Sequence, residues 1–141
     1  MHVNLTWAGA VQFHGTTATG HSLTIDGPAE GGGQNGGPRP MELMLMGAAG
    51  CTAYDVVTIL GKSRQEVTRC DIEASATRAD GVPAVFETIH FRFRLRGHNL
   101  DASKVERAIR LSAEKYCSGS ITLKRAGVTV THDFEIEADT P

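Results

Sequence analysis

The stretch MELMLMGAAGCTAYDVVTILGK, residues Met41–Lys62, decides the fold. Apart from the terminal lysine its only charged residues are Glu42 and Asp55, and apolar side chains would occupy every face of a helix at this position. A helix that is apolar all round is either buried at the centre of a protein or spans a membrane. The length barely suffices for a membrane span, and Glu42, Tyr54 and Asp55 interrupt it. A central buried helix is therefore expected, and no membrane partner.

The segments on either side of this helix alternate in the way that strands do. Strands are expected at 3–7, 10–14, 21–26, 69–78, 87–97 and 128–137, an amphipathic helix at 100–117 and a short helical piece at 118–126. The segment from Gly27 to Pro40, GPAEGGGQNGGPRP, predicts a flexible loop because glycine and proline dominate it. This order indicates an α+β fold rather than a wound parallel sheet.

The whole chain of 141 residues is expected to form one domain, 1–141, because no repeat or second domain is evident. One chain of this size has few elements with which to cover a helix that is apolar on all sides. A second copy is therefore expected to supply the missing cover, which predicts an obligate homodimer.

The bulk composition excludes some classes of partner and compartment. The net charge is -2 and 21% of residues are charged, so no positive field is present to attract nucleic acid. The arginines at 92, 94 and 96 alternate along one strand, and a solvated or carboxylate-paired face is expected there. The N-terminus, MHVNLTWAG, has no basic region followed by an apolar stretch, so no signal peptide is expected and the cytoplasm is the default location.

The chain contains three cysteines, Cys51, Cys70 and Cys117. So small and uneven a number does not indicate a disulfide framework of the secreted kind. Cys51 lies in the apolar helix after four small residues, whereas Cys117 lies at a break between helical pieces. A helix N-terminus there would stabilise a thiolate. Cys70 is expected to fill the core from a strand. No histidine pair has ligand spacing, so neither a metal site nor a cofactor is expected.

Two segments carry a family resemblance. PMELMLMGAAGCTAYDVV (40–57) and LSAEKYCSGSITL (111–123) resemble the first- and second-cysteine segments of the OsmC/Ohr superfamily, in particular its YhfA-like branch. The resemblance implies an intertwined homodimer in which two long central helices lie back to back and antiparallel sheets wrap around them. Each site would hold both cysteines of one subunit near the dimer interface.

The resemblance also implies a thiol-dependent peroxidase acting on organic hydroperoxides. Cys51 would be the peroxidatic thiolate, which becomes a sulfenic acid, and Cys117 would resolve it as a disulfide. An external dithiol would then restore both thiols.

The match departs from the characterised peroxidases at two positions. Those enzymes place a glutamate directly after the proline that begins the helix and an arginine in the N-terminal strands. Here Met41 follows the proline, and no lysine or arginine precedes Arg39. Glu42, Arg39 and His14 are the possible substitutes. A buried thiol without a cation is a poor nucleophile, so the alternative is a non-peroxidase that binds a small hydrophobic ligand at the dimer interface.

Overall fold

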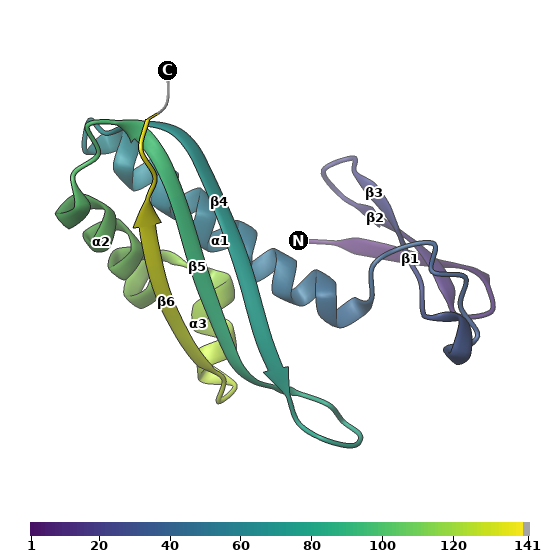
Figure 1. Cartoon of the computed structure of the whole chain (residues 1–141). Helices are drawn as coiled ribbons and strands as arrows, with labels where there is room; N and C mark the ends of the chain where they lie inside the picture. The colour runs from purple at the N-terminus through teal and green to yellow at the C-terminus, as the bar shows by residue number, and fades with distance from the viewer. Residues whose placement is uncertain (140–141) are drawn as a thin grey trace. The chain divides into compact units, whose positions relative to one another are not determined.

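A computed structural model describes residues 1–139, which divide into two compact units, Met1–Met44 and a second unit that begins at Leu45. The elements, labelled in Figure 1, are β1 (Val3–Gly9), β2 (Gln12–Thr17), β3 (Ser22–Ile25), the 3₁₀ turn η1 (Ala29–Gly31), α1 (Pro40–Lys62), β4 (Glu66–Arg78), β5 (Phe86–His98), α2 (Ala102–Leu111), the π-helical turn η2 (Ser112–Tyr116), α3 (Ser118–Arg125) and β6 (Thr129–Ile136). The expected α+β composition is confirmed.

The first unit contains an antiparallel sheet in the order β1-β2-β3. Trp7 pairs with Phe13 and Phe13 with Ile25, so these side chains share one face of the sheet. The large apolar residues of this face are mostly exposed in the single chain: Val3, Leu5, Trp7, Phe13 and Leu23. The opposite face carries polar residues such as His14 and Thr24, whose side chains bond at 3.0 Å.

The glycine-rich loop after β3 is organised around the buried carboxylate of Asp26. Its oxygens accept the backbone N–H groups of Gly27, Gln34 and Gly36 at 2.7, 3.1 and 3.0 Å. These bonds lower the pKa of Asp26 to about 2, with the Gly36 and Gly27 N–H groups as the largest causes. The predicted loop is confirmed apart from the short turn η1, and one buried anion organises it where no apolar side chain is available to pack.

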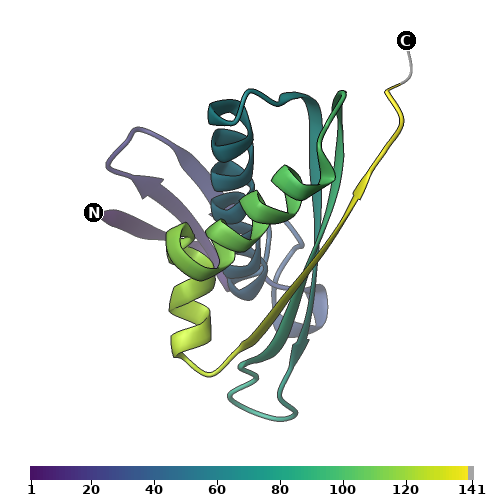
Figure 2. The ribbon, with the colours of Figure 1, turned by 90° about the vertical axis from the view of Figure 1, so that its left-hand side faces the viewer.

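The second unit contains the sheet β4-β5-β6. β4 and β5 are antiparallel, whereas β5 and β6 are parallel. The expectation of purely antiparallel sheets is thus wrong for β6. The chain from β5 to β6 passes through α2, η2 and α3, and such a helical crossover returns the strand in the same direction. Figure 2 shows α1, α2 and α3 on one side of this sheet.

The core of the second unit lies between this sheet and the helices. Ile89, Phe91, Phe93 and Leu95 of β5 are fully buried, as their alternation predicts. On the other face Arg94 pairs with Glu135 and Glu73 at 3.0 and 3.3 Å, and Arg92 and Arg96 also meet carboxylates from β6 and the residue after it. The prediction of a carboxylate-paired arginine face is confirmed.

Helix α1 is buried along only one stripe of the single chain, formed by Ala48, Thr52, Val56 and Leu60. Tyr54 is 71% exposed and Val57 is 39% exposed. The helix is long and apolar enough to cross a membrane by length and composition alone, a test that the core helix of a soluble protein also passes. The expected burial on all sides is not provided within one chain.

Candidate functional site

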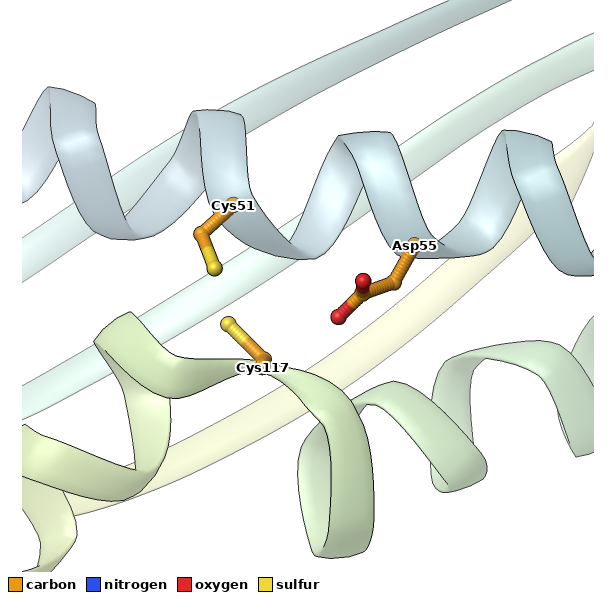
Figure 3. A group of neighbouring side chains, drawn as sticks. All are labelled: Cys51, Asp55 and Cys117. Atoms are coloured by element: carbon orange, nitrogen blue, oxygen red, sulfur yellow. The ribbon is translucent and has the colours of Figure 1, made fainter.

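Cys51 and Cys117 lie opposite one another in the second unit. Cys51 projects from α1 and Cys117 is the N-cap residue of α3, and Figure 3 shows their sulfur atoms turned toward each other beside Asp55. The two sulfurs and a carboxylate oxygen of Asp55 all lie within 4.8 Å of one another. Cys51 is partly exposed, whereas Cys117 is fully buried. The two cysteines predicted to act together are therefore neighbours, although 66 positions (117 − 51) separate them.

A π-helical turn between α2 and α3 places Cys117. The Cys117 N–H donates to the carbonyl of Ser112 at 2.8 Å, five residues earlier, instead of continuing the α-helical pattern. The sequence alone predicted one helix through residue 117, and it ends earlier than expected. The wider turn directs Ser112 and Cys117 toward α1, since both side chains contact groups there. Single π turns of this kind are often found at functional sites.

Gly119 allows the start of α3 to approach α1 closely. A methyl group on Gly119 would lie 3.1 Å from the Cα of Ala48 and 3.4 Å from the Cβ of Cys51. The absence of a side chain here keeps the backbone of α3 against the helix that carries Cys51. Ala48, on the other side of this contact, is one of the four small residues that precede Cys51.

Buried hydroxyl groups connect the two helical segments next to the sulfurs. Thr52 and Ser112 are fully buried, and their hydroxyl oxygens lie 2.9 Å apart. The Ser112 hydroxyl donates to Asp55 Oδ2 at 3.0 Å. Asp55 therefore has an intrachain partner that fixes its carboxylate at the site. No sequence pattern indicates Ser112 as a site residue, because only the π turn brings it to Asp55.

Burial dominates the electrostatics of Cys117. Desolvation raises its pKa above the ordinary value of a thiol, and the neighbouring Cys51 acts in the same direction. Two contacts with Ser120 act to lower it: the Ser120 N–H approaches the sulfur at 3.3 Å, and the Ser120 hydroxyl lies at 3.1 Å. The predicted helix N-terminus is confirmed, but its stabilisation of a thiolate is outweighed by burial. The thiol is thus the stable form of Cys117, with its proton directed to Ser120.

The three possible support residues have their own partners within the first unit. Glu42 accepts the Arg39 N–H at 2.8 Å and so caps the start of α1. The Arg39 guanidinium donates to the carbonyl of Gly37 at 3.1 Å, and His14 bonds Thr24. Their predicted part in the chemistry stays a prediction. Cys70 lies on the inward face of β4. Burial is the main cause that raises the pKa of its thiol, and the negative charge of Asp71 is a smaller cause.

The family model described as OsmC-like protein matches residues 32–133, which includes both cysteines and the whole of β4, β5, α2 and α3. The chain belongs to the OsmC-like family. Among curated relatives, this OsmC-like chain is 39% identical over 138 residues to "Protein YhfA" of Escherichia coli strain K12, covering 98% of this chain and 99% of the relative.

Solved structures agree with the family assignment. The OsmC-like chain superposes with a TM-score of 0.85 and 29% identity on a hypothetical protein from Aquifex aeolicus VF5, covering 99% of this chain and 97% of that one. It superposes with a TM-score of 0.62 and 22% identity on the organic hydroperoxide resistance protein OhrB of Bacillus subtilis, covering 95% and 96%. The latter likeness establishes a shared fold.

Proposed function

We propose that this OsmC-like protein is a thiol-dependent reductase of organic hydroperoxides that uses Cys51 and Cys117. The observation that carries the proposal is the proximity of the two sulfurs, within 4.8 Å, on helices that pack against each other at Gly119. Disulfide formation from this arrangement requires the two sulfurs, which lie within 4.8 Å of each other, to approach to about 2.05 Å. The name of the Bacillus subtilis neighbour, an organic hydroperoxide resistance protein, is consistent with this chemistry.

The proposed reaction assigns different tasks to the two thiols. The partly exposed Cys51, as thiolate, attacks the distal oxygen of a hydroperoxide, so that an S–O bond forms while the O–O bond breaks. The alkoxide that leaves takes a proton from water and departs as the alcohol. The Cys117 sulfur then attacks the sulfenic acid, losing its proton as the S–S bond forms and water leaves. An external cytoplasmic dithiol reduces the disulfide by exchange and restores both thiols. No resident cofactor enters this cycle.

The accessibility of the sulfurs supports this assignment of roles. A peroxide must reach the attacking sulfur, and Cys51 is the partly exposed member of the pair. Cys117 is fully buried and its pKa is raised, which suits a thiol that waits for an adjacent sulfenic acid. The reverse order of attack would require a buried, protonated thiol to meet the peroxide first.

The test is thiol titration of the reduced protein before and after one equivalent of cumene hydroperoxide, in the presence of a chelator. We expect rapid loss of two thiols and a Cys51–Cys117 disulfide in the mass map. Cys51→Ser should abolish peroxide consumption, whereas Cys117→Ser should trap a sulfenic acid at Cys51. Cys70→Ser is the matched control and should react like the wild type. Full activity in Cys51→Ser would refute the proposal.

We further propose that the working form is a homodimer. An exposed stripe runs along α1 with alternating spacings of three and four residues, and it consists of Gly47, Gly50, Tyr54, Val57 and Gly61. Two helices that pack along their length require this spacing. A methyl group on any of these three glycines would have open space within the single chain. The apolar face of the β1-β2-β3 sheet also lacks cover in its own unit.

Dimerisation is tested with Tyr54→Arg, which places a charge in the middle of the exposed stripe. Sedimentation should give a dimer for the wild type and a monomer for the variant. Trp7, the single tryptophan, is 66% exposed in one chain. Its emission should report a covered environment in the wild type and shift to the red on dissociation. A monomeric wild type would contradict the proposal.

A second candidate function rests on an apolar cavity in the first unit. The cavity has a volume of about 290 Å³, and its lining includes the apolar side chains of Val3, Leu5, Leu23, Ile25 and Leu43. Such a cavity suits a small hydrophobic ligand. Ligand-induced stabilisation that is unchanged in a Cys51/Cys117 double variant, together with thiols that resist hydroperoxide, would favour this function over the peroxidase.

A further inference from the structure

We infer that Cys51, Cys117 and Asp55 form a binding site for a thiophilic divalent cation of the Zn²⁺ class, because the fold brings two sulfurs and a carboxylate oxygen to one point. The three ligand atoms come from α1 and from the residue that precedes α3. All their mutual separations are at most 4.8 Å. Sequence spacing did not indicate this site, because it contains no histidine and its two cysteines are far apart in the chain.

The separations fit tetrahedral coordination after a small contraction. Zinc binds thiolate sulfur at about 2.3 Å and carboxylate oxygen at about 2.1 Å, so ligand atoms in a tetrahedral site lie roughly 3.5–3.8 Å apart. The longest separation here, 4.8 Å, requires a contraction of about 1 Å. Rotation of the three side chains about their Cα–Cβ bonds is the movement that would bring the ligand atoms together.

The carboxylate is already held in position by groups that are not ligands. The Ser112 hydroxyl donates to Asp55 Oδ2 at 3.0 Å, and Thr52 lies 2.9 Å from Ser112. One oxygen of Asp55 is thereby oriented while the other stays available. Metal-binding carboxylates are usually supported by hydrogen bonds of this kind, which fix the direction of the ligand atom.

The charge of the ligand set favours a dication. Metal binding displaces the thiol protons of Cys51 and Cys117 to solvent, so the bound ion faces two thiolates and a carboxylate with three negative charges. No ion pair of Asp55 with a lysine, arginine or histidine occurs among residues 1–139. Two sulfur ligands select Zn²⁺ or Co²⁺ over Mg²⁺ and Ca²⁺, which require oxygen. Asp55 also lines a cavity of about 540 Å³, from which water can provide a fourth ligand.

The experiment is anaerobic titration of the reduced full-length protein with Zn²⁺ against a colorimetric chelator, and with Co²⁺ observed by absorption. We expect one ion per chain and a sulfur-to-cobalt charge-transfer band with the intensity of a tetrahedral site. Cys51→Ser and Asp55→Asn should each weaken binding by about 100-fold or more, and Ser112→Ala by about 10-fold, the effect of losing a supporting hydrogen bond. Cys70→Ser is the matched control and should bind like the wild type.

Equal binding by all variants, or loss of binding in Cys70→Ser alone, would overturn the inference. Because Cys117 is buried, Cys117→Ser can perturb folding, so the decision rests on the two more exposed ligands. The inference does not depend on the proposed peroxidase activity. Metal binding is measured without peroxide and peroxide reduction with a chelator present, so failure of one leaves the other measurable.

Discussion

Removal of the buried Thr52–Ser112 contact should loosen the attachment of the π turn to α1. Both hydroxyl groups are fully buried and lie 2.9 Å apart, and Ser112 also donates to Asp55 at 3.0 Å. Ser112→Ala deletes both interactions at once. Thr52→Val is nearly isosteric and deletes only the first, which leaves Ser112 bonded to Asp55.

The expected magnitudes follow from the number and type of bonds lost. A bond between neutral groups contributes about 0.5–1.5 kcal/mol, and one to a charged group about 1.5–3 kcal/mol. Asp55 is only half-buried, so water can replace part of its lost bond. We therefore expect Ser112→Ala to lower the free energy of unfolding by about 2–3 kcal/mol and Thr52→Val by about 1 kcal/mol. The double variant should cost about 1 kcal/mol less than the sum, because both single changes remove the same contact.

Urea unfolding under reducing conditions, followed by circular dichroism at two protein concentrations, measures these differences. Two concentrations are used because the stability of the proposed dimer would depend on protein concentration. Ser75→Ala, a change on the exposed face of β4, is the control and should stay within about 0.5 kcal/mol of the wild type. Strictly additive effects of the two substitutions would refute the inferred coupling between α1 and the π turn.

Three further outcomes are expected for stability. Gly37→Ala should destabilise the first unit by about 2 kcal/mol or more in a thermal melting assay, because the new methyl group would overlap the backbone carbonyl of Thr24. Gly31→Ala is the control and should be tolerated, because its methyl group has room. Asp26 has a folded-state pKa of about 2, below its unfolded value of 3.8. Its contribution to the free energy of unfolding is therefore present above pH 4 and is lost as the pH falls from 4 to 2. In Asp26→Asn the free energy of unfolding should depend less on pH between 4 and 2. Burial lowers the pKa of His132 from 6.5 to about 4, and the charge of Lys124 is a smaller cause. The unfolded chain therefore binds a proton more readily, and the free energy of unfolding should decrease as the pH falls from 6.5 to 4. If His132→Gln has the same pH profile as the wild type, His132 is not the cause.

Regular elements of the fold were predictable because their signals are local. The alternation in β5 identified the row of apolar residues that face the core, and the long apolar run identified α1. The amphipathic pattern predicted the helix that contains α2, and its N-cap residue Asp101 accepts the Ser103 N–H at 2.9 Å. Each of these depends on side-chain periodicity or on residues within one turn of each other.

Other features depended on contacts between distant parts of the chain. The parallel pairing of β6 is set by the crossover, and the order of the glycine-rich loop is set by Asp26, neither of which leaves a periodic signal. The π turn also leaves no periodic signal in the sequence, because it depends on tertiary contacts. One of these is the hydrogen bond that Lys124 Nζ donates to the carbonyl of Ala113 at 2.9 Å.

The sequence by itself determined the family, the composition of the fold and the identity of the two cysteines, because these follow from local patterns and from two recognisable segments. Only the tertiary structure decided what surrounds the sulfurs. Asp55, Ser112 and Thr52 meet there because a π turn redirects the chain and Gly119 lets two helices approach. Hydrogen bonding and metal coordination depend on distances of a few ångströms, and residues about sixty positions apart acquire such distances only through packing.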